Sequence, residues 1–211
     1  MPKASLVQKK DYDSCPEGFS EVPLTTKKWK TEYAGYGKVV YRQNMIFMEP
    51  KKARTPQSTH ASLVLSKFDI NSENFDIVVD YKNETALRKQ NPNPWEVFWL
   101  FFNYVPGVNN VKTTNYVVAK PNGIEVGRAA GLTDQAFIKT TESPQAKFDE
   151  WHRLRVHKTD GALKIYFNEE FVFDIPANQI FTVKGKLGLY SEDASVVVKR
   201  ICLNSDIQLR H

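Results

Sequence analysis

Apolar and polar residues alternate along much of the chain in short runs, and turn-forming Gly, Pro, Asn or Asp residues separate the runs. Alternation with a period of two is typical of a half-buried β-strand. The helical pattern, in which apolar residues recur every three or four positions, is nearly absent. We therefore expect an all-β protein, a two-sheet antiparallel sandwich of the jelly-roll type.

The runs predict about a dozen strands in one domain over residues 1–211. The tightest hairpin is expected at Pro121-Asn122-Gly123, because Asn and Gly adopt positive φ at little cost. Loops are expected at residues 69–74 and 106–114, and the pattern assigns no structure to residues 1–25. The expected strands are residues 38–47, 60–66, 75–82, 96–104, 116–120, 124–128, 136–140, 152–158, 162–167, 171–175, 185–190 and 195–203.

The run NPNPWEVFWLFFNY, residues 91–104, breaks the alternation because it is apolar on both faces. Successive side chains of a strand point to opposite faces of its sheet. We expect a central strand with one face in the core and the other on a ligand-binding surface, and the pattern does not decide between them. One face would carry Trp95, Val97, Trp99, Phe101 and Asn103. The other face would carry Glu96, Phe98, Leu100, Phe102 and Tyr104.

The composition, 41% hydrophobic and 25% charged residues, predicts a soluble domain with a sizeable core. No apolar stretch approaches the roughly 20 residues of a membrane-spanning helix, so we expect no membrane span. The N-terminal run MPKASLVQKKDYDS lacks a segment of signal-peptide length, which predicts either an intracellular protein or a mature form. The net charge of +5 favours acidic partners, although an ordinary solvated surface gives the same charge.

Two cysteines, Cys15 and Cys202, lie near opposite ends of the sequence. The termini of a compact domain often lie close together, so a disulfide is geometrically feasible. Two free thiols fit the sequence equally well, because the spacing does not report the Cα distance that a disulfide requires. A metal site built on this pair is not expected.

Several segments of the chain resemble the concanavalin A-like lectin/glucanase superfamily, over about residues 60–203. The segments are TALRKQNPNPWEVFWLFFNY, NYVVAKPNGIEVGRA, FDEWHRLRVHKTDGALKIYFNEEFVFDIP and GKLGLYSEDASVVVKRICL. They are most similar to laminin-G-like and polysaccharide-lyase-like jelly rolls. The resemblance implies two antiparallel sheets, one of them concave, and an extracellular or cell-surface setting. It does not imply one activity, because this fold hosts lectins, hydrolases, lyases and adhesion modules.

The resemblance also raises the question of a structural calcium ion, which many members of the superfamily hold on the last strand. Val198-Lys199-Arg200 would place two positive charges there in this chain. The acidic run DINSE at residues 69–73 is an alternative, but it lacks the Gly and the late Glu of an EF-hand loop. We expect no cofactor and no metal site, with a structural calcium as the alternative.

A glycoside hydrolase of this fold needs two carboxylates close together on one strand. Glu96 and Glu125 are each the only acidic residue of their expected strands, and the pairs Glu169-Glu170 and Glu192-Asp193 fall in expected turns. The hydrolase hypothesis is therefore disfavoured.

A polysaccharide lyase needs other groups. One side chain neutralises the uronate carboxylate and another removes the neighbouring proton. Tyr116, Lys120, Arg88 and His60 are of the right types. The Gln-(Ile/Val)-His strand of alginate lyases is missing, so a lyase acting by β-elimination on a uronic-acid polymer is the alternative rather than the main hypothesis.

A carbohydrate-binding module needs aromatic rings on which sugars stack and polar groups that bind their hydroxyls. The pattern offers Trp95, Trp99, Tyr104, Tyr116 and Tyr166 for stacking, although any one of these rings could equally be core. The expected ligand-binding residues are Trp95, Glu96, Trp99, Asn103, Tyr104, Tyr116, Lys120 and Arg128.

The hypothesis that the sequence favours is a non-catalytic lectin-like or adhesion module that binds a glycan, including an acidic polysaccharide, on its concave sheet. A structural module that binds another protein is a further alternative. No nucleic-acid motif is present. Outward-facing basic residues on two adjoining strands also predict a basic patch, made of Arg153, Arg155, His157, Lys158 and Lys164.

Overall fold

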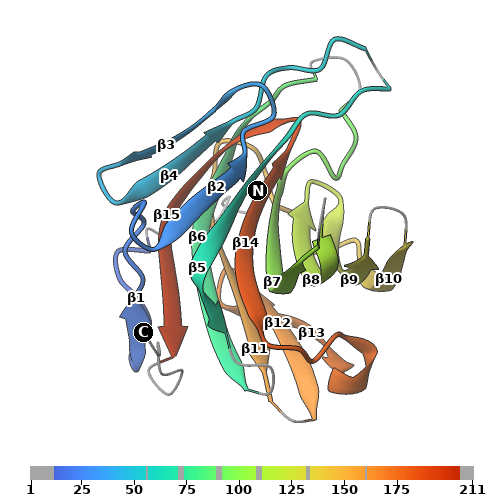
Figure 1. Ribbon diagram of the computed structural model, residues 1–211. Helices are drawn as coiled ribbons and strands as arrows, with labels where there is room; N and C mark the ends of the chain where they lie inside the picture. The colour runs from blue at the N-terminus through green and yellow to red at the C-terminus, as the bar shows by residue number, and fades with distance from the viewer. Residues whose placement is uncertain are drawn as a thin grey trace, which may run out of the picture.

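The computed structural model describes residues 12–55, 57–70, 74–88, 92–107, 111–131, 134–159 and 161–204. Within these ranges it is a sandwich of two antiparallel sheets, and its only helix is the 3-10 turn Ala177–Gln179 (Figure 1). No helix of the described residues is long and apolar enough to cross a membrane. The expected all-β sandwich is therefore confirmed.

The first sheet has eight strands, and β6 and β15 lie near its centre. The short strand β1 (Phe19–Glu21) pairs with β15 beside the main path. In order, the other strands are β13 (Glu170–Pro176), β12 (Ala162–Phe167), β11 (Trp151–Lys158), β6 (Phe75–Ala86), β15 (Ala194–Asn204), β4 (Met45–Glu49) and β3 (Lys38–Arg42).

The second sheet has seven strands and runs across Figure 1 from β2, beside the N-terminal strands, to β10 at the far right. Its centre is formed by β7, the strand that is apolar on both faces, with β8 and β14 on either side. In order, the strands are β10 (Asp134–Thr141), β9 (Gly123–Ala130), β8 (Val111–Lys120), β7 (Phe98–Pro106), β14 (Gly185–Glu192), β5 (Ala61–Ile70) and β2 (Trp29–Tyr33).

The core between the sheets decides which face of β7 is buried. Phe98, Leu100 and Phe102 are fully buried in the main hydrophobic cluster, together with the inward residues of the opposite sheet. Trp99 and Phe101 belong to two small clusters on the outer face, away from this core. The second apolar face of the strand is therefore a surface feature of the sheet and not part of the main core.

A bulge in β7 changes the predicted alternation. Asn103 has a φ of 50°, and the pairing with β8 slips after Phe102. An extra residue in one strand reverses the direction of the side chains that follow it. Tyr104 therefore lies in the outer cluster with Phe101, although simple alternation placed it on the face of Phe98.

One strand prediction and one loop prediction are wrong, and the strand β2 (Trp29–Tyr33) was missed. Residues 38–47 form a hairpin and not one strand, because Gln43 and Asn44 adopt φ of 51° and 54° and turn β3 back onto β4. Residues 106–114 are not all loop, because β8 begins at Val111 and pairs with β9 from Thr113 onward. Residues 108–110 lie outside the described part of the chain.

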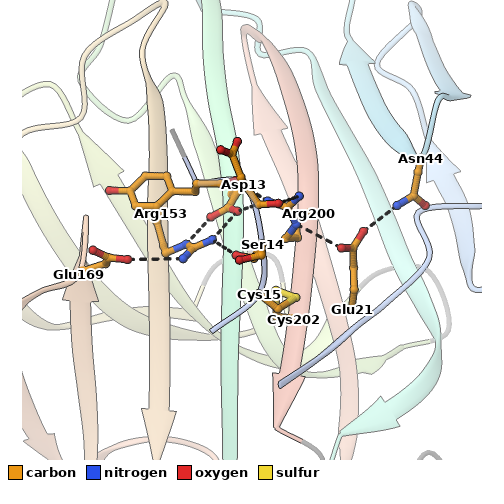
Figure 2. The surroundings of a disulfide bond; sticks show 11 residues. Asp13, Ser14, Cys15, Glu21, Asn44, Arg153, Glu169, Arg200 and Cys202 are labelled. Atoms are coloured by element: carbon orange, nitrogen blue, oxygen red, sulfur yellow. Dashed lines mark hydrogen bonds and ion pairs between the residues drawn. A yellow bond between two sulfur atoms is a disulfide. The ribbon is translucent and has the colours of Figure 1, made fainter. Parts of the chain in front are cut away.

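The N-terminal residues contain more order than the sequence pattern assigned. Cys15 and Cys202 form a disulfide with their Cα atoms 5.8 Å apart, which settles the question that the spacing left open. Figure 2 shows this bond beside Arg153 and Arg200, whose guanidinium groups donate to the carbonyls of Ser14 and Asp13 at 2.8 and 2.9 Å. Residues 12–18, the N-terminal strap, thus lie across the outer face of the eight-stranded sheet.

Candidate functional site

The outer face of the seven-stranded sheet carries a group of aromatic residues from β7, β8 and β14 that we call the aromatic platform. The strand registers bring them together: Trp99 lies opposite Tyr190 of β14, and Phe101 lies opposite Tyr116 of β8. Tyr104 joins them through the bulge. The platform consists of Trp99, Phe101, Tyr104, Tyr116 and Tyr190.

The rings of the platform contact one another closely. Phe101 is nearly parallel to Tyr190 and to Tyr104, with interplanar angles of 20° and 8° and centroid distances of 5.1 and 6.3 Å. Trp99 lies edge-on to Tyr190 and 4.9 Å from Tyr116. Phe101 and Tyr190 keep part of their surface in solvent, whereas Trp99, Tyr104 and Tyr116 are buried. The platform therefore presents an apolar surface backed by a packed second layer of rings.

Two glycines leave room for the platform rings. A Cβ atom on Gly127 would collide with the hydroxyl oxygen of Tyr116, so this side chain extends over β9. A Cβ atom on Gly188 would lie 2.9 Å from the Cβ of Phe101. Any larger residue at either position would push a ring away from the sheet, because contacts this short must be relieved.

A hydrogen-bonded cluster on β8, β9 and β10 adjoins the platform. The Tyr116 hydroxyl donates to Glu125 Oε1 at 3.0 Å and accepts from Gln135 Nε2 at 2.9 Å. Lys120 Nζ lies 2.6 Å from Glu125 Oε2. Burial raises the pKa of Tyr116 well above its usual range. The cluster fixes the position of the Tyr116 ring, and burial keeps the phenol protonated.

Glu192 adds an acidic group at the other side of the platform, where the Tyr190 hydroxyl donates to its Oε2 at 3.0 Å. Burial of its carboxyl raises the pKa of Glu192 to about 7, the hydrogen bond from Tyr190 opposes this rise, and Asp193 and Glu96 add to it. Near neutral pH this group therefore exists in both protonated and ionised forms.

The loop before β7 is fixed by a buried ionic cluster. Arg88 Nε lies 2.7 Å from Glu96 Oε1, and Arg88 Nη2 lies 3.0 Å from Asp193 Oδ2. The backbone N–H of His60 donates to the other oxygen of Asp193 at 3.3 Å. Trp95, next to Glu96, is 45% exposed, and its carbonyl accepts a hydrogen bond from the Trp99 indole at 2.8 Å. The cluster thus holds the backbone of Trp95 next to Trp99.

Asn103 and Arg128, two expected ligand-binding residues, hold the segment before β14. Asn103 is fully buried, and its Nδ2 donates to the Val183 carbonyl at 2.7 Å. Arg128 Nη1 donates to the Gln179 carbonyl at 3.1 Å, and its guanidinium lies over the Phe181 ring. Both side chains thus contact the protein itself. Glu96 is likewise buried, in the cluster with Arg88.

The four residues considered for lyase chemistry fall into two separate groups. Tyr116 and Lys120 share Glu125, whereas Arg88 and His60 share Asp193. A base must accept a proton, but the Tyr116 hydroxyl already donates to a carboxylate and its raised pKa keeps it protonated. Nothing in this arrangement favours β-elimination.

Hydrolase chemistry and metal binding find no support at the site either. The platform residues of β7 are Trp99, Phe101 and Tyr104, so the strand offers no carboxylate to the platform. No group of three or more His, Cys, Asp or Glu residues among those that the structure describes could hold a metal ion. Asp69 of the acidic run is paired with Lys186 at 3.1 Å, and residues 71–73 lie outside the described ranges.

Two of the expected candidates lie on the other sheet. Tyr166 packs against Phe171 on the outer face of the eight-stranded sheet, so it is not part of the platform. The basic patch is wrong as predicted, because Asp76 accepts two bonds from Arg155 and Asp80 accepts two from Arg153. These carboxylates belong to β6, which the sequence places more than 70 residues away.

Sequence reasoning identified Trp99, Tyr104 and Tyr116 but missed Phe101 and Tyr190 as members of the platform. The missed signal was the alternation in GKLGLYSE, residues 185–192, which places both Gly188 and Tyr190 on one face of β14. A glycine two residues before an aromatic residue, facing an aromatic strand, indicates space for a ring.

No family model matches the chain, and no curated protein matches it in sequence. Solved structures do match it. A carbohydrate-binding module, CBM66, from Bacillus subtilis has 17% identity and a TM-score of 0.62, covering 84% of this chain and 96% of that one. A β-glucanase from Bacillus licheniformis has 9% identity and a TM-score of 0.62, with coverages of 89% and 98%.

A third match is the exoplasmic/lumenal domain of VIP36, solved with Ca²⁺ and Man3GlcNAc bound. It has 12% identity and a TM-score of 0.59, and it covers 90% of this chain and 88% of that one. At these identities the likeness concerns the fold and not the activity. The sequence resemblance is confirmed at that level: the chain has the concanavalin A-like jelly-roll fold.

Proposed function

We propose that this chain is a non-catalytic module that binds a glycan on its aromatic platform. The observation that carries the proposal is the packing of five aromatic residues on the outer face of one sheet, over glycines that leave room for them. Sugar rings stack their C–H faces on aromatic side chains, and polar groups at the margin bind the hydroxyls. Glu192 and Gln135, which are hydrogen-bonded to Tyr190 and Tyr116, lie at that margin.

The similar structures support the proposal without deciding it. One is named as a carbohydrate-binding module, and another is described with the glycan Man3GlcNAc bound. The match to a β-glucanase carries less weight for this chain, because no carboxylate of β7 faces the platform. An acidic polysaccharide, which the net charge favours, is one ligand class within the proposal.

A glycan array with neutral and acidic glycans tests the proposal directly. Phe101→Ala and Tyr190→Ala should each weaken binding by at least about tenfold, which is about 1.4 kcal/mol, because each removes a partly exposed ring. Phe171→Ala is the matched control, since Phe171 is 56% exposed but lies on the other sheet. Its binding should equal that of the parent chain.

The outcomes separate the alternatives. The absence of binding to every glycan on the array would contradict glycan binding and favour the protein-interaction alternative. Equal losses in Phe171→Ala and Phe101→Ala would place binding elsewhere than the platform. Release of unsaturated product from alginate, pectate or glucuronan, followed by ultraviolet absorbance, would establish the lyase alternative.

A further inference from the structure

We infer that the ligand of the platform is an uncharged oligosaccharide that lies across the strands of the seven-stranded sheet. This inference rests on the proposed function and specifies the class of glycan. Two independent observations carry it: the pairing of the charges that border the platform, and the direction in which its apolar residues follow one another.

The lysines that border the platform are occupied by carboxylates of the protein. Lys120 lies 2.6 Å from Glu125, and Lys186 lies 3.1 Å from Asp69. Lys30, opposite Leu65 in the register, lies 2.9 Å from Glu32. A uronate would have to displace one of these partners. Lys112 lies further away, four residues along β8 from Tyr116.

The acidic group on the platform also disfavours an anionic ligand. Glu192 is half-buried and is hydrogen-bonded to Tyr190, whose ring contacts both Trp99 and Phe101. A carboxylate of a sugar stacked on these rings would face a carboxyl group that is ionised in part of the molecules. Like charges in such a site repel, whereas sugar hydroxyls can donate to Glu192 or accept from it.

The apolar residues are arranged in rows that run perpendicular to the strands. One row crosses five adjacent strands, β2, β5, β14, β7 and β8, and strands spaced about 4.8 Å apart make it roughly 19 Å long. This length exceeds a single sugar ring. The row consists of Tyr33, Leu63, Tyr190, Trp99 and Val118.

A second row lies beside the first and extends to β10 at the opposite edge. It consists of Leu65, Gly188, Phe101, Tyr116, Gly127 and Phe137. Together the rows form an apolar strip in which Tyr33, Tyr190, Phe101 and Phe137 keep surface in solvent, while the other side chains are buried. Glu125, opposite Val118 on β9, ends the first row. Glu192 and Lys120 lie beyond one long side of the strip, and the Lys186–Asp69 pair lies beyond the other. A chain of sugar rings has the same layout, since its ring faces are apolar and its hydroxyls lie at the edges.

The test uses cello-, laminari- and manno-oligosaccharides from the disaccharide to the hexasaccharide, each with a counterpart oxidised to uronates at the primary hydroxyls. Isothermal titration should give affinities for one neutral series that rise at least about tenfold with length. Oxidation should lower affinity by about tenfold or more. Raising the salt concentration should leave the neutral affinities unchanged, because no ion pair to ligand forms.

Two variants at opposite ends of the strip test its direction. Tyr33→Ala and Phe137→Ala remove rings that are 45% and 66% exposed, on β2 and β10. At least one should weaken hexasaccharide binding several-fold while leaving disaccharide binding unchanged. Phe171→Ala is again the control. Both variants remove surface rings, so circular dichroism should report an intact fold.

Each result has a defined meaning. Tighter binding of an oxidised series, weakened by salt, overturns the inference but leaves the proposed glycan-binding function in place. Affinity independent of length, or no effect of both end variants on the hexasaccharide, overturns the placement across the strands. If none of the six oligosaccharide series binds but another glycan on the array does, the inference alone is overturned. If no glycan on the array binds, the proposed function is overturned as well.

Discussion

The two sheets differ in what their outer faces carry. The outer face of the eight-stranded sheet carries charged residues whose guanidinium and carboxylate groups pair across β6, β11 and β15, with the N-terminal strap lying over them. The outer face of the seven-stranded sheet carries rings whose nearest charged neighbours lie at the margin. One face is thus covered by the chain itself, and the other presents apolar surface to solvent.

The comparison shows that side chains pointing outward from the two sheets have different surroundings. Arg153 points outward from β11, yet it is buried because the Tyr12 ring of the strap and the Asp80 carboxylate cover it. Tyr190 also points outward, from β14, and part of its ring stays in solvent. We therefore expect changes on the first face to alter stability, and changes on the second to alter binding.

The largest expected effect is at Asp80, which is fully buried between Arg153 at 2.7 Å and Arg200 at 3.2 Å. Asp80→Ala leaves two guanidinium groups without their shared carboxylate, and breaking a buried pair costs about 3–5 kcal/mol. Urea unfolding should report this loss, while glycan affinity of the folded fraction stays unchanged. Asp69→Asn, at an exposed pair, should cost less than about 1 kcal/mol.

The next effect concerns the disulfide. Replacing Cys15 and Cys202 together by Ser removes a constraint on the unfolded chain, and the loss of a native disulfide typically costs about 2–5 kcal/mol. Thermal melting should report a lower midpoint, and adding a reductant to the parent chain should produce the same shift. A parent chain that melts identically with and without reductant would contradict this expectation. Because disulfides persist in oxidising compartments, we expect the chain to work in one.

A smaller effect is expected at Gly127, where one substitution should change both the stability of the fold and the affinity for glycan. Gly127→Ala places a Cβ atom against Tyr116 and 2.6 Å from the Ala136 carbonyl, so ring and backbone must both shift, at a cost of about 1–3 kcal/mol. Glycan affinity should fall together with stability. Gly161→Ala, where an added Cβ meets nothing within 4 Å, should change neither. Unchanged affinity in Gly127→Ala would show that the position of the buried Tyr116 ring does not affect binding.

The smallest effect is the pH dependence that Glu192 contributes. Burial raises the pKa of its carboxyl from the usual 4.5 to about 7. The hydrogen bond from Tyr190 and the charge of Arg88 lower this pKa, while Asp193 and Glu96 raise it. The folded chain therefore holds this proton more tightly than the unfolded chain. The stabilisation is complete below pH 4.5 and is lost as the pH rises through about 7.

The variant Glu192→Gln should remove this contribution. Comparing parent and variant by urea unfolding at about pH 5 and about pH 8 should give a difference near 1 kcal/mol, after allowance for partial solvent screening. The parent chain should lose more stability than the variant between the two conditions. Parallel pH profiles for the two chains would contradict the assignment of the shift to this residue.

The sequence predicted the sandwich because alternation with a period of two depends on local residues only. It also placed Trp99 and Tyr116 among the candidates for the site. It could not decide between the two faces of β7, because both are apolar and the bulge at Asn103 moves Tyr104 to the other face. Nor could it find the carboxylate partners of Arg153, because Asp80 lies 73 residues away and reaches it only through strand pairing.

The bond between Cys15 and Cys202 spans 187 residues, so it closes nearly all of the chain into one covalent ring. A protease that cuts a single loop of this ring opens it without releasing a fragment. The two pieces would remain linked through the sulfurs, and after a cut between β6 and β15 the pairing of these two strands would also hold the pieces together. A module built in this way can lose the continuity of its backbone at an exposed loop and still hold both sheets, with the platform, in one molecule.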